Sequence, residues 1–388
     1  MPERKKAGRR SNNEGCIRQR PNGLWEAQYI VAYKPDGHPI RRSIYGQKKS
    51  EVRMKLRDIL LSIERDEYIE PSHLTIGDWL EEWFRIYCLP HKKASTCTGY
   101  EEEIYLHLKP YIGRVPLQEL KAQHIQAAIN ELVKEGKASA TVRKAHTILH
   151  AALEQAVINQ MLLRNPSEHT ILPKFEQEEI RFFTSEEQKR FIEALPESTA
   201  GRALYFILGT GLRMAELAGL RWCDIHGNSF TVKQTIGRIR DFSDDAPTRT
   251  RLEASTPKTK AGRRTIPLSS KMQELLATQR VIQLETRLAQ GPAWNAYDLV
   301  FCSDLGTPYE GRNLRRALHR TLKKAGLPQM GVHALRHTFA TRAIESGMDV
   351  RTLSEILGHT KVALTLQLYA HSSMETKQKE LAKMDAFL

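Results

Sequence analysis

The sequence predicts a multidomain, mainly α-helical chain with small β elements, an α+β fold. Its 388 residues are too many for one ordinary hydrophobic core. Strand-like alternation is confined to a basic N-terminal stretch and a few short runs, whereas helical periodicity dominates from residue 75 onward. We therefore expect three domains, at 1–70, 71–170 and 171–388. The first is a small three-stranded sheet with one helix, the second a four-helix module, and the third a mainly helical domain with a small antiparallel sheet.

Within the first domain, Pro21-Asn22-Gly23 and Pro35-Asp36-Gly37 are turn signals that separate three short strands. Aromatic and small apolar residues alternate with others from Trp25 to Tyr33, which predicts one aromatic face. A helix is expected from about Lys48 to Asp66. Its inner side should carry the apolar residues Val52, Leu56, Ile59, Leu60 and Ile63.

Positive charge is concentrated at the same end of the chain. Residues 1–57 hold fifteen Lys and Arg against five Asp and Glu, a net charge of +10, which leaves +4 of the total +14 for the other 331 residues. A polyanion is the natural partner of such a segment, and a basic sheet of this size can enter a major groove. A basic tail that serves only solubility is the alternative.

The second domain is helical throughout its length in prediction. Four amphipathic segments lie between residues 75 and 160, separated by Pro, Gly or Ser/Thr helix starts. Basic side chains near these starts would add to the attraction of helix N-termini for phosphate. We expect this domain to bind rather than to catalyse.

Residues 165–184 contain two prolines and mixed charge, and are predicted to be an interdomain linker. A helix is expected to begin at Ser185, with this serine as the start of a capping box. Strands are predicted at 229–236, 263–268 and 299–303. The remainder of the third domain is expected to be helical.

The cysteines are scattered, odd in number and never spaced as CxxC, which favours reduced thiols in the cytoplasm over disulfides or a structural zinc cluster. No apolar run reaches 18 residues, so no membrane span is expected, and the basic N-terminus lacks the apolar segment of a secretory signal.

Two motifs of the third domain carry cationic side chains. In GTGLRMAELAGLRW, 209–222, Thr210 is a candidate N-cap, which would place Arg213 in the first helical turn and Glu216 one turn later. An arginine there opposes the helix dipole unless an anion joins it. In TPKTKAGRRTIPL, 256–268, Lys258 precedes a strand, where a hairpin can carry it into a DNA groove. Taken singly, each is more often a surface pair or a basic turn.

Two further motifs carry histidine. HALRHTFATR, 333–342, places His333 and Arg336 on one helical face, with His337 one turn after His333. Histidines four apart can chelate zinc, but the metalloprotease pattern needs a glutamate where Ala334 stands. LGHTKVALTLQLYAH, 357–371, has a tyrosine ten positions after a histidine. Helical spacing alone would make that tyrosine a core residue.

Together the four motifs resemble the tyrosine recombinases of the phage integrase family. The order of the residues and the spacing within 357–371 match, over roughly 185–371. Upstream, the helical module and the basic sheet look like the core-type and arm-type DNA-binding domains of integrases, particularly those of conjugative transposons. The matching residues are Arg213, Lys258, His333, Arg336, His359 and Tyr369.

This resemblance implies a metal-free and ATP-free reaction with no cofactor. Tyr369 would attack a phosphodiester and form a 3′-phosphotyrosyl link that keeps the bond energy for rejoining. The planar forks of two arginines suit the phosphate oxygens, and His359 would bind the same phosphate. By resemblance His333 is the acid/base candidate, Lys258 the general acid for the leaving 5′-oxygen, and Glu216 supports Arg213.

The partners expected are double-stranded DNA attachment sites, four protomers around two such sites, and an accessory excisionase or DNA-bending protein. The apolar C-terminal tail, 372–388, would pack on a neighbouring protomer or on its own. Phosphate contacts carry no sequence information, so basic residues cannot be sorted into base readers and backbone binders. The candidates for DNA contact are Arg18, Arg20, Arg41, Arg42, Lys92, Lys93, Arg143 and Lys144.

Three alternatives remain open at this point. A type IB topoisomerase shares this chemistry but relaxes supercoils, and has little use for a second DNA-binding address. A DNA-binding regulator with an inactive catalytic domain would bind DNA without cleaving it. A zinc hydrolase would lose activity in EDTA.

Overall fold

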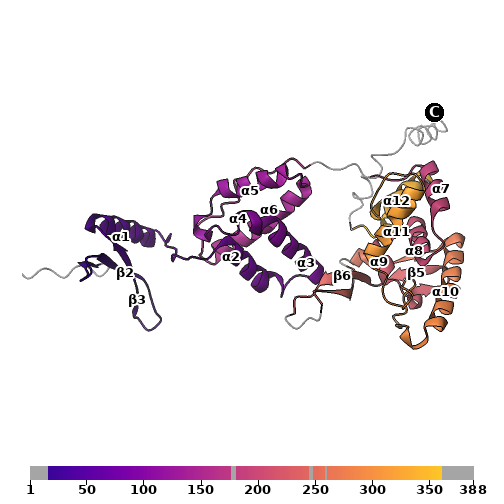
Figure 1. Ribbon diagram of the computed structural model, residues 1–388, viewed down its shortest axis with the longest axis horizontal. Coiled ribbons are helices and arrows are strands. Elements are labelled where there is room, and N and C mark those ends of the chain that lie inside the picture. The colour runs from indigo at the N-terminus through magenta and orange to yellow at the C-terminus, as the bar shows by residue number, and fades with distance from the viewer. Residues whose placement is uncertain (1–15, 176–180, 244–247, 258–259, 361–388) are drawn as a thin grey trace, which may run out of the picture. The chain divides into compact units, whose positions relative to one another are not determined.

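The computed structural model describes residues 16–175, 181–243, 248–257 and 260–360 (Figure 1). The chain divides into two compact units, one of residues 1–92 and 99–176 and one of residues 93–98 and 177–388. The predicted fold class is confirmed, because small antiparallel sheets accompany a mainly helical chain.

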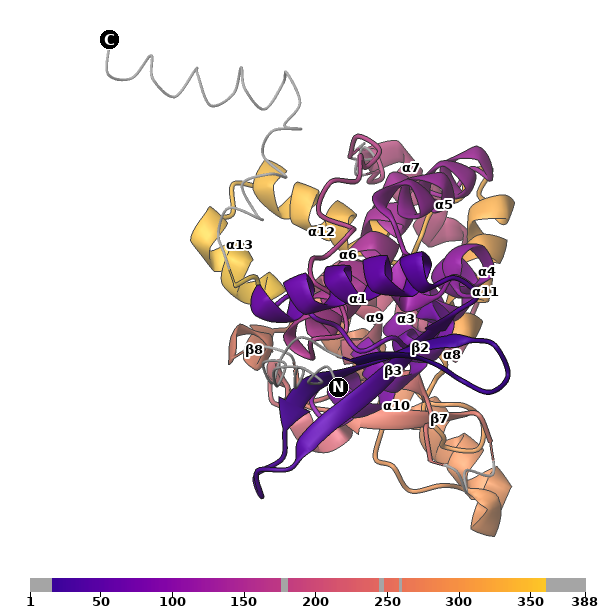
Figure 2. The same ribbon diagram turned by 90° about the vertical axis from the view of Figure 1, so that its left-hand side faces the viewer.

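The first unit begins with the predicted three-stranded antiparallel sheet, of order β1-β2-β3. The strands are β1 Cys16–Gln19, β2 Trp25–Tyr33 and β3 Pro39–Gly46, and the helix α1 Lys49–Glu64 lies across one face of the sheet (Figures 1 and 2). Ala27 and Tyr29 form the core with the predicted inner side of α1. The aromatic face is shorter than predicted: the register shifts between Ile30 and Ala32, and Tyr33 is 58% exposed.

The predicted helical module follows, as four helical stretches between residues 76 and 158. Two of them contain π-helical segments, which the sequence pattern did not reveal. The buried Trp79 donates its Nε1–H to the carbonyl of Ala152 at 2.9 Å and so joins the first stretch to the last. The elements are α2 Ile76–Trp83, η1 Phe84–Cys88, α3 Ala94–Glu103, η2 Ile104–Leu108, α4 Lys109–Ile112, η3 Leu117–Glu119, α5 Ala122–Lys134 and α6 Ser139–Ile158.

The predicted linker, 165–184, is wrong at both ends. At its start, Asn165 donates to the Glu154 carboxylate on α6 at 2.6 Å, and Asn165 is almost fully buried. At its end, Phe183 is fully buried in the second unit, and its backbone N–H donates to Thr338 Oγ1 at 3.0 Å. Prolines and mixed charge stop a helix, but they do not prevent a chain from packing through polar side chains.

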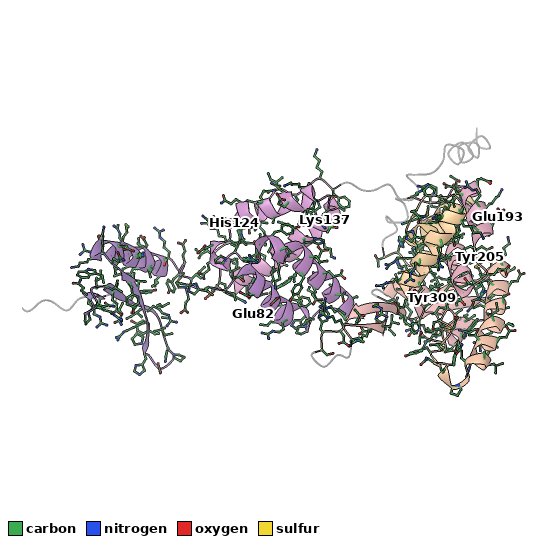
Figure 3. The ribbon with its side chains drawn as sticks, viewed as in Figure 1. Glu82, His124, Lys137, Glu193, Tyr205 and Tyr309 are labelled. Atoms are coloured by element: carbon green, nitrogen blue, oxygen red, sulfur yellow. The ribbon has the colours of Figure 1, made fainter. Side chains whose placement is uncertain are left out.

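The second unit is built around α8, which packs most extensively against α12, α11 and α10. Its core is apolar and continuous, and the partly buried Tyr205 and Tyr309 pack on it (Figure 3). The helices are α7 Ser185–Ala194, α8 Thr199–Thr210, α9 Met214–Gly219, η4 Trp222–Asp224, η5 Lys260–Gly262, α10 Ser270–Gln290, η6 Gly291–Ala293, α11 Gly311–Lys324, α12 His333–Glu345 and α13 Val350–Leu357.

The helix predicted from Ser185 is present, but its capping residue is Thr184. The Thr184 Oγ1 accepts the backbone N–H of Glu187 at 3.2 Å, and the Glu187 carboxylate accepts the backbone N–H of Thr184 at 2.9 Å. The box is therefore shifted by one residue, because Glu187, not Gln188, closes it.

Strands of the second unit differ from the prediction in several places. The run 229–236 splits into β5 Ser229–Val232 and β6 Thr235–Arg240, because Gln234 between them bonds the carbonyl of Gly219 at 3.0 Å. The strand β7 Thr250–Ser255 was not predicted, and it pairs with β6 as a hairpin. Residues 299–303 form isolated bridges rather than a strand. A separate sheet has the order β4-β5-β8, from β4 Ile225–His226 and β8 Arg264–Pro267.

No helix within the described ranges is long and apolar enough to cross a membrane.

Candidate active site

The first motif lies at the junction of two helices, and the predicted N-cap is wrong. Thr210 is the last residue of α8, and its hydroxyl donates to the Phe206 carbonyl in the preceding turn. Gly211 then turns the chain with φ of +68°, at a point where a Cβ would lie 2.5 Å from the Phe339 ring. The turn leaves Arg213 itself as the N-cap of α9, with extended backbone.

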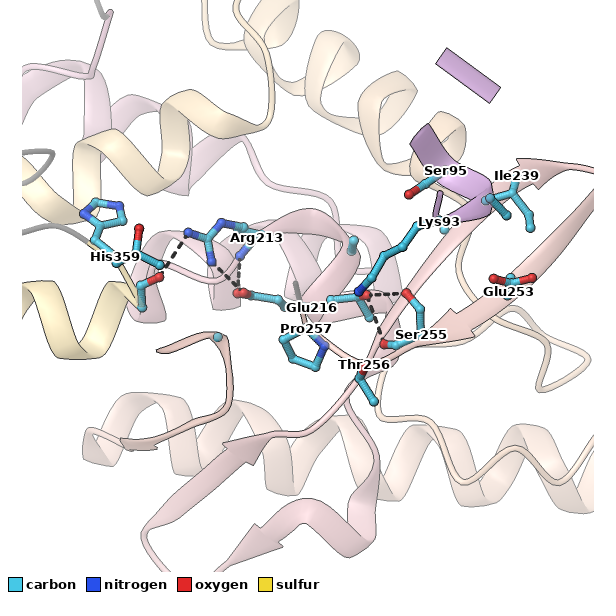
Figure 4. Close-up of a pocket in the computed structure, with 17 residues that line it drawn as sticks. Lys93, Ser95, Arg213, Glu216, Ile239, Glu253, Ser255, Thr256, Pro257 and His359 are labelled. Atoms are coloured by element: carbon cyan, nitrogen blue, oxygen red, sulfur yellow. Dashed lines mark hydrogen bonds and ion pairs between the residues drawn. The ribbon is translucent and has the colours of Figure 1, made fainter. Parts of the chain in front are cut away.

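Glu216 is the third residue of α9 and is almost fully buried. One oxygen accepts from the Arg213 guanidinium at 2.8 Å, and the other accepts the Arg213 backbone N–H at 3.0 Å (Figure 4). The carboxylate therefore fixes both ends of Arg213. Burial is the strongest influence on the pKa of Glu216 and raises it, but the hydrogen bond and charge of Arg264, together with Arg213, outweigh burial and hold the pKa below its ordinary value.

Arg264 is a member of this site that the sequence analysis did not assign. Its guanidinium bonds both oxygens of Glu216 at 3.0 Å, and its side chain is only 7% exposed. The available signal was its position in RRTIPL: Arg264, Ile266 and Leu268 alternate with exposed residues in and after β8, so the arginine occupies a core-facing position. A buried arginine needs a carboxylate partner, which sequence alone does not identify.

Arg336 comes from α12, one turn after its first residue, and is 2% exposed. Its two terminal nitrogens donate to the carbonyls of Gly211 at 2.8 Å and Leu357 at 2.7 Å. It thereby ties the end of α8 to the end of α13. Burial, with the nearby charge of Arg213, lowers the pKa of Arg336 to about 9, so the group stays cationic at neutral pH.

His333 begins α12, and its ring meets that of His337 edge-on, with centroids 4.6 Å apart. Desolvation, then the charges of Arg336 and Arg213, lower the pKa of His333. The pKa of His337 is lowered to about 4, chiefly by desolvation and then by electrostatic interaction with His333 and Arg336. Both imidazoles are therefore neutral at pH 7. Among the described residues, no third histidine, cysteine or carboxylate joins them in a group able to hold a metal ion.

His359 follows the end of α13. Gly358 caps this helix with φ of +66°, and the backbone N–H of His359 donates to the Ser354 carbonyl at 3.0 Å. His359 lines one pocket together with Arg213 and Glu216 (Figure 4). Desolvation first, then the charges of Arg336, Arg213 and Arg264, lower the pKa of His359 to about 4.

Of the six motif residues, the structure therefore brings Arg213, Arg336 and His359 around the end of α13, with His333 at the start of the helix that carries Arg336. Lys258 and Tyr369 lie outside the described residues. The segment before Lys258 is described, and Thr256 and Pro257 line the same pocket as Arg213 and His359 (Figure 4).

The candidates for DNA contact in the N-terminal sheet differ in their partners. Arg18 and Arg20 both bond the Glu26 carboxylate, each at 2.8 Å. Arg42 forms an ion pair with Glu70, and Arg41 is exposed on β3.

The other four candidates belong to the helical segments. Lys92 lies over the Tyr100 ring, 5.3 Å from its centroid, and Lys93 immediately precedes α3. Lys144 pairs with Glu103 at 2.9 Å. Arg143 is half-buried and donates to the Pro173 carbonyl at 3.0 Å, which makes it the candidate least available to DNA.

A stronger basic surface, on α11, was missed. This helix has a single apolar side, and no carboxylate stands among its residues. Its outer side is exposed, and no ion pair to an acidic residue is found for these cations within the described ranges. The exposed basic residues are Arg312, Arg315, Arg316, Arg320, Lys323 and Lys324.

Comparison with known proteins gives a consistent result. Residues 181–376 match the model of the phage integrase family, and residues 75–133 match the phage integrase N-terminal SAM-like domain. A tyrosine recombinase XerC-like protein of Caldanaerobacter subterraneus is 30% identical, over 87% of this chain and 89% of that protein. The ICEBs1 integrase of Bacillus subtilis is 25% identical, over 96% of this chain and all of the relative.

Two solved structures share the fold. The integrase of the transposon Tn1549, in complex with a circular intermediate DNA, has a TM-score of 0.65 at 20% identity, over 80% of this chain and 99% of that one. A lambda integrase tetramer bound to a Holliday junction has a TM-score of 0.58 at 19% identity, over 93% of this chain and 96% of that one.

Proposed function

We propose a mechanism for this chain, which belongs to the phage integrase family and is a tyrosine recombinase, an enzyme that cuts and rejoins DNA. The observation that carries the proposal is the convergence of motif residues far apart in sequence. Arg336 and Arg213 reach the carbonyls of Leu357 and Gly358, at 2.7 Å and 3.5 Å, directly before His359. Such a cluster of guanidinium groups beside a neutral imidazole suits a phosphodiester.

In the proposed reaction, the phenol oxygen of Tyr369 attacks the scissile phosphorus and its proton passes to neutral His333. The bond between phosphorus and the 5′-oxygen breaks, and the leaving oxygen takes a proton from Lys258. The tyrosine remains joined to the 3′-phosphate, and a 5′-hydroxyl of another strand reverses the step. No oxidant, nucleotide or metal is needed for this balance.

Arg213, Arg336 and His359 are proposed to hold the scissile phosphate. The carbonyl contacts of Arg336 use one N–H of each terminal nitrogen, so other N–H groups of its guanidinium remain for phosphate. The pKa of His359, about 4, makes it a neutral hydrogen-bond donor rather than a second cation. Glu216 is proposed to keep Arg213 in place.

We propose that the three regions 1–70, 71–170 and 171–388 bind arm-type sites, bind core-type sites and catalyse, respectively. The N-terminal arginines and the exposed basic side of α11 are proposed to contact DNA phosphates, since exposed cations supply most of the affinity for a polyanion. Arg143 is the weakest candidate because its side chain already donates to the carbonyl of Pro173.

The relatives support a mobile element as the biological context, because the Tn1549 enzyme is a transposon integrase. We propose that this chain integrates or excises such an element in the cytoplasm, acting on double-stranded attachment sites. A tetramer is proposed from the lambda integrase complex on a Holliday junction. An excisionase or DNA-bending partner completes the proposal.

Covalent trapping tests the mechanism. Full-length protein is mixed, in EDTA, with nicked duplexes made from the ends of the element that encodes it, and a denaturant-resistant adduct is measured. We expect an adduct with the wild type and none with Tyr369→Phe, which removes one hydroxyl. An adduct that persists in this variant contradicts the choice of nucleophile. Tight binding without any adduct favours an inactive regulator, and a supercoiled-plasmid assay separates recombination from relaxation.

A further inference from the structure

Three arginines from three separate elements cap the end of α13. Arg264 on β8 donates Nε–H to the Ile356 carbonyl, Arg336 on α12 donates to Leu357, and Arg213 before α9 donates to Gly358. These are consecutive carbonyls at a helix C-terminus. The last carbonyls of a helix have no N–H partner within it and carry partial negative charge. The residue that follows them is His359.

The segment that carries Arg264 also touches this helix end directly. A Cβ on Gly358 would lie 2.8 Å from the Ala261 carbonyl and 2.9 Å from an Arg264 terminal nitrogen. The close approach is independent of the hydrogen bonds and shows that β8 and the end of α13 are packed without space for a side chain. Arg264 is therefore in contact with the chain that delivers His359.

The second contact of Arg264 is the carboxylate that holds Arg213. Among the described residues, the four contacts to the Glu216 oxygens lie between 2.8 and 3.0 Å, two of them from Arg264 and two from Arg213. Arg264 is the buried partner, at 7% exposure, whereas Arg213 is 38% exposed. The two arginines thus share one carboxylate, and only Arg213 faces solvent.

The cluster carries more positive than negative charge. Among the described residues of the cluster, three guanidinium groups face one carboxylate, and the lowered pKa values of His333 and His359 keep both neutral at pH 7. The surplus of two positive charges matches in size the two negative charges that the scissile phosphate carries once the oxygen of Tyr369 has lost its proton and added to phosphorus. If Arg264 were absent, Arg213 alone would neutralise Glu216, and only the charge of Arg336 would remain for the phosphate.

We propose that Arg264 is a positioning residue of the recombination reaction: as the buried counter-ion of Glu216 it leaves Arg213 available to the scissile phosphate, and it anchors the helix end that carries His359. This rests on the function proposed above. Arg264 touches neither substrate nor reacting atoms in this role, since its donors are directed to Glu216 and to backbone carbonyls.

The test compares Arg264→Gln with Arg263→Gln, a matched control at the next residue, where an exposed arginine loses the same charge. Single-turnover cleavage of a nicked duplex is measured at saturating DNA, together with DNA affinity. We expect Arg264→Gln to cleave about 10²-fold more slowly, the size of effect that misplacement of a reacting group produces. Its affinity should fall no more than that of the control. Equal cleavage rates for the two variants would overturn the proposal.

Arg264→Lys and a double variant separate positioning from a general loss of structure. Lysine keeps the charge but not the two-pronged contact, so it should recover part of the cleavage rate. Glu216→Gln/Arg264→Gln should lose much less than the product of the two single losses, because one role of Arg264 is exerted through Glu216. Losses that multiply in the double variant, or a lysine variant as slow as the glutamine one, would contradict the inference.

A double-mutant cycle of protein stability, measured without DNA, tests this proposal separately from the proposed function. The same single and double variants of the full chain are unfolded thermally, and their changes in stability are compared. Strong non-additivity is expected for two groups joined by two hydrogen bonds, and additive changes would refute the pairing. Failure of the wild type to form a Tyr369-dependent adduct would remove the recombinase mechanism, while this cycle would still decide whether Arg264 holds Glu216.

Discussion

Two buried carboxylates, Glu26 in the N-terminal sheet and Glu216 in the second unit, are each bonded by two arginines. Their side chains are 1% and 3% exposed, so the carboxylates themselves are nearly equivalent. The arginines differ. Arg18 and Arg20 are 60% and 42% exposed, whereas the Glu216 pair consists of a half-exposed Arg213 and the buried Arg264.

The difference determines which arginines can move to a phosphate. An exposed ion pair is worth little, because water replaces a departing partner. A buried pair is costly to separate, because the remaining charge stays uncompensated. We therefore expect one of Arg18 and Arg20 to exchange Glu26 for a DNA phosphate while the other still compensates the buried carboxylate, and Arg264 to keep its partner throughout the reaction. The hydrogen bonds of Arg20 and then Arg18 lower the pKa of Glu26 to about 2, so this carboxylate is ionised while the arginines are bound to it.

The largest effect is expected from Arg336, the most deeply buried cation of the proposed site. Arg336→Gln leaves at least one of the Gly211 and Leu357 carbonyls without its donor and removes the charge beside the phosphate. We predict a loss of about 10³-fold in single-turnover cleavage, at the upper end for one electrostatic donor, and a lower unfolding temperature. Arg263→Gln, at an exposed position before β8, is the control and should cleave normally at saturating DNA. If Arg336→Gln cleaved within tenfold of the wild-type rate, the role given to its buried charge would be contradicted.

A second prediction compares the two carboxylates by the same substitution. Glu216→Gln should slow cleavage by about 10²-fold, because Arg213 loses its fixed position. Glu26→Gln should leave cleavage at a core site unchanged, because its arginines are exposed and do not depend on it for solvation. It should instead steepen the salt dependence of DNA binding, by about 0.9 in the logarithmic slope for each phosphate newly contacted. Salt titrations and single-turnover rates measure both. Equal losses of cleavage for the two variants would mean that the burial of the arginine partner does not distinguish Glu216 from Glu26.

The smallest effect is expected from pH. The pKa values of His337 and His359 are about 4 in the folded protein, against an ordinary 6.5. Between these values the unfolded chain binds protons that the folded chain does not, so stability rises with pH from about 4 to 6.5 and is level above 7. The lowered pKa of Glu216 acts in the same direction at lower pH.

His337→Asn should flatten this rise. A fully buried imidazole contributes up to about 1.4 kcal/mol per pH unit, and we expect about half of that because the ring keeps some contact with solvent. The measurement is the unfolding temperature of the full chain at several pH values. His226→Asn, at an exposed position on β4, is the control. A slope that His337→Asn leaves intact would show that other groups account for the acid sensitivity.

Much of the fold followed from local patterns. The three strands, the inner side of α1 and the four helical stretches were predicted because periodicity and turn residues act over a few neighbouring positions. Errors occurred where distant contacts decided the outcome. The run 229–236 breaks where Gln234 bonds Gly219, and 165–173 packs on the helical module although its composition resembles a linker.

The motif residues of the site were assigned from sequence, whereas their partners were not. Arg213 was placed inside a helix, but Gly211 must turn the chain against Phe339 and Leu357, and this makes Arg213 the residue before the helix. Arg264 had been included only within a predicted strand. Nothing in RRTIPL indicates that the strand lies beside Glu216, 48 residues earlier.

The sequence by itself determined the helical and strand segments, the concentration of charge at the N-terminus and the residue types available for phosphoryl chemistry. Only the tertiary structure decided which arginine is buried, which is exposed, and which carboxylate each one bonds. The reason is physical: a local pattern depends on neighbours along the chain, but the energy of a charge depends on the water and counter-ions around it. Folding alone brings β8, α9, α12 and α13 together and sets that environment.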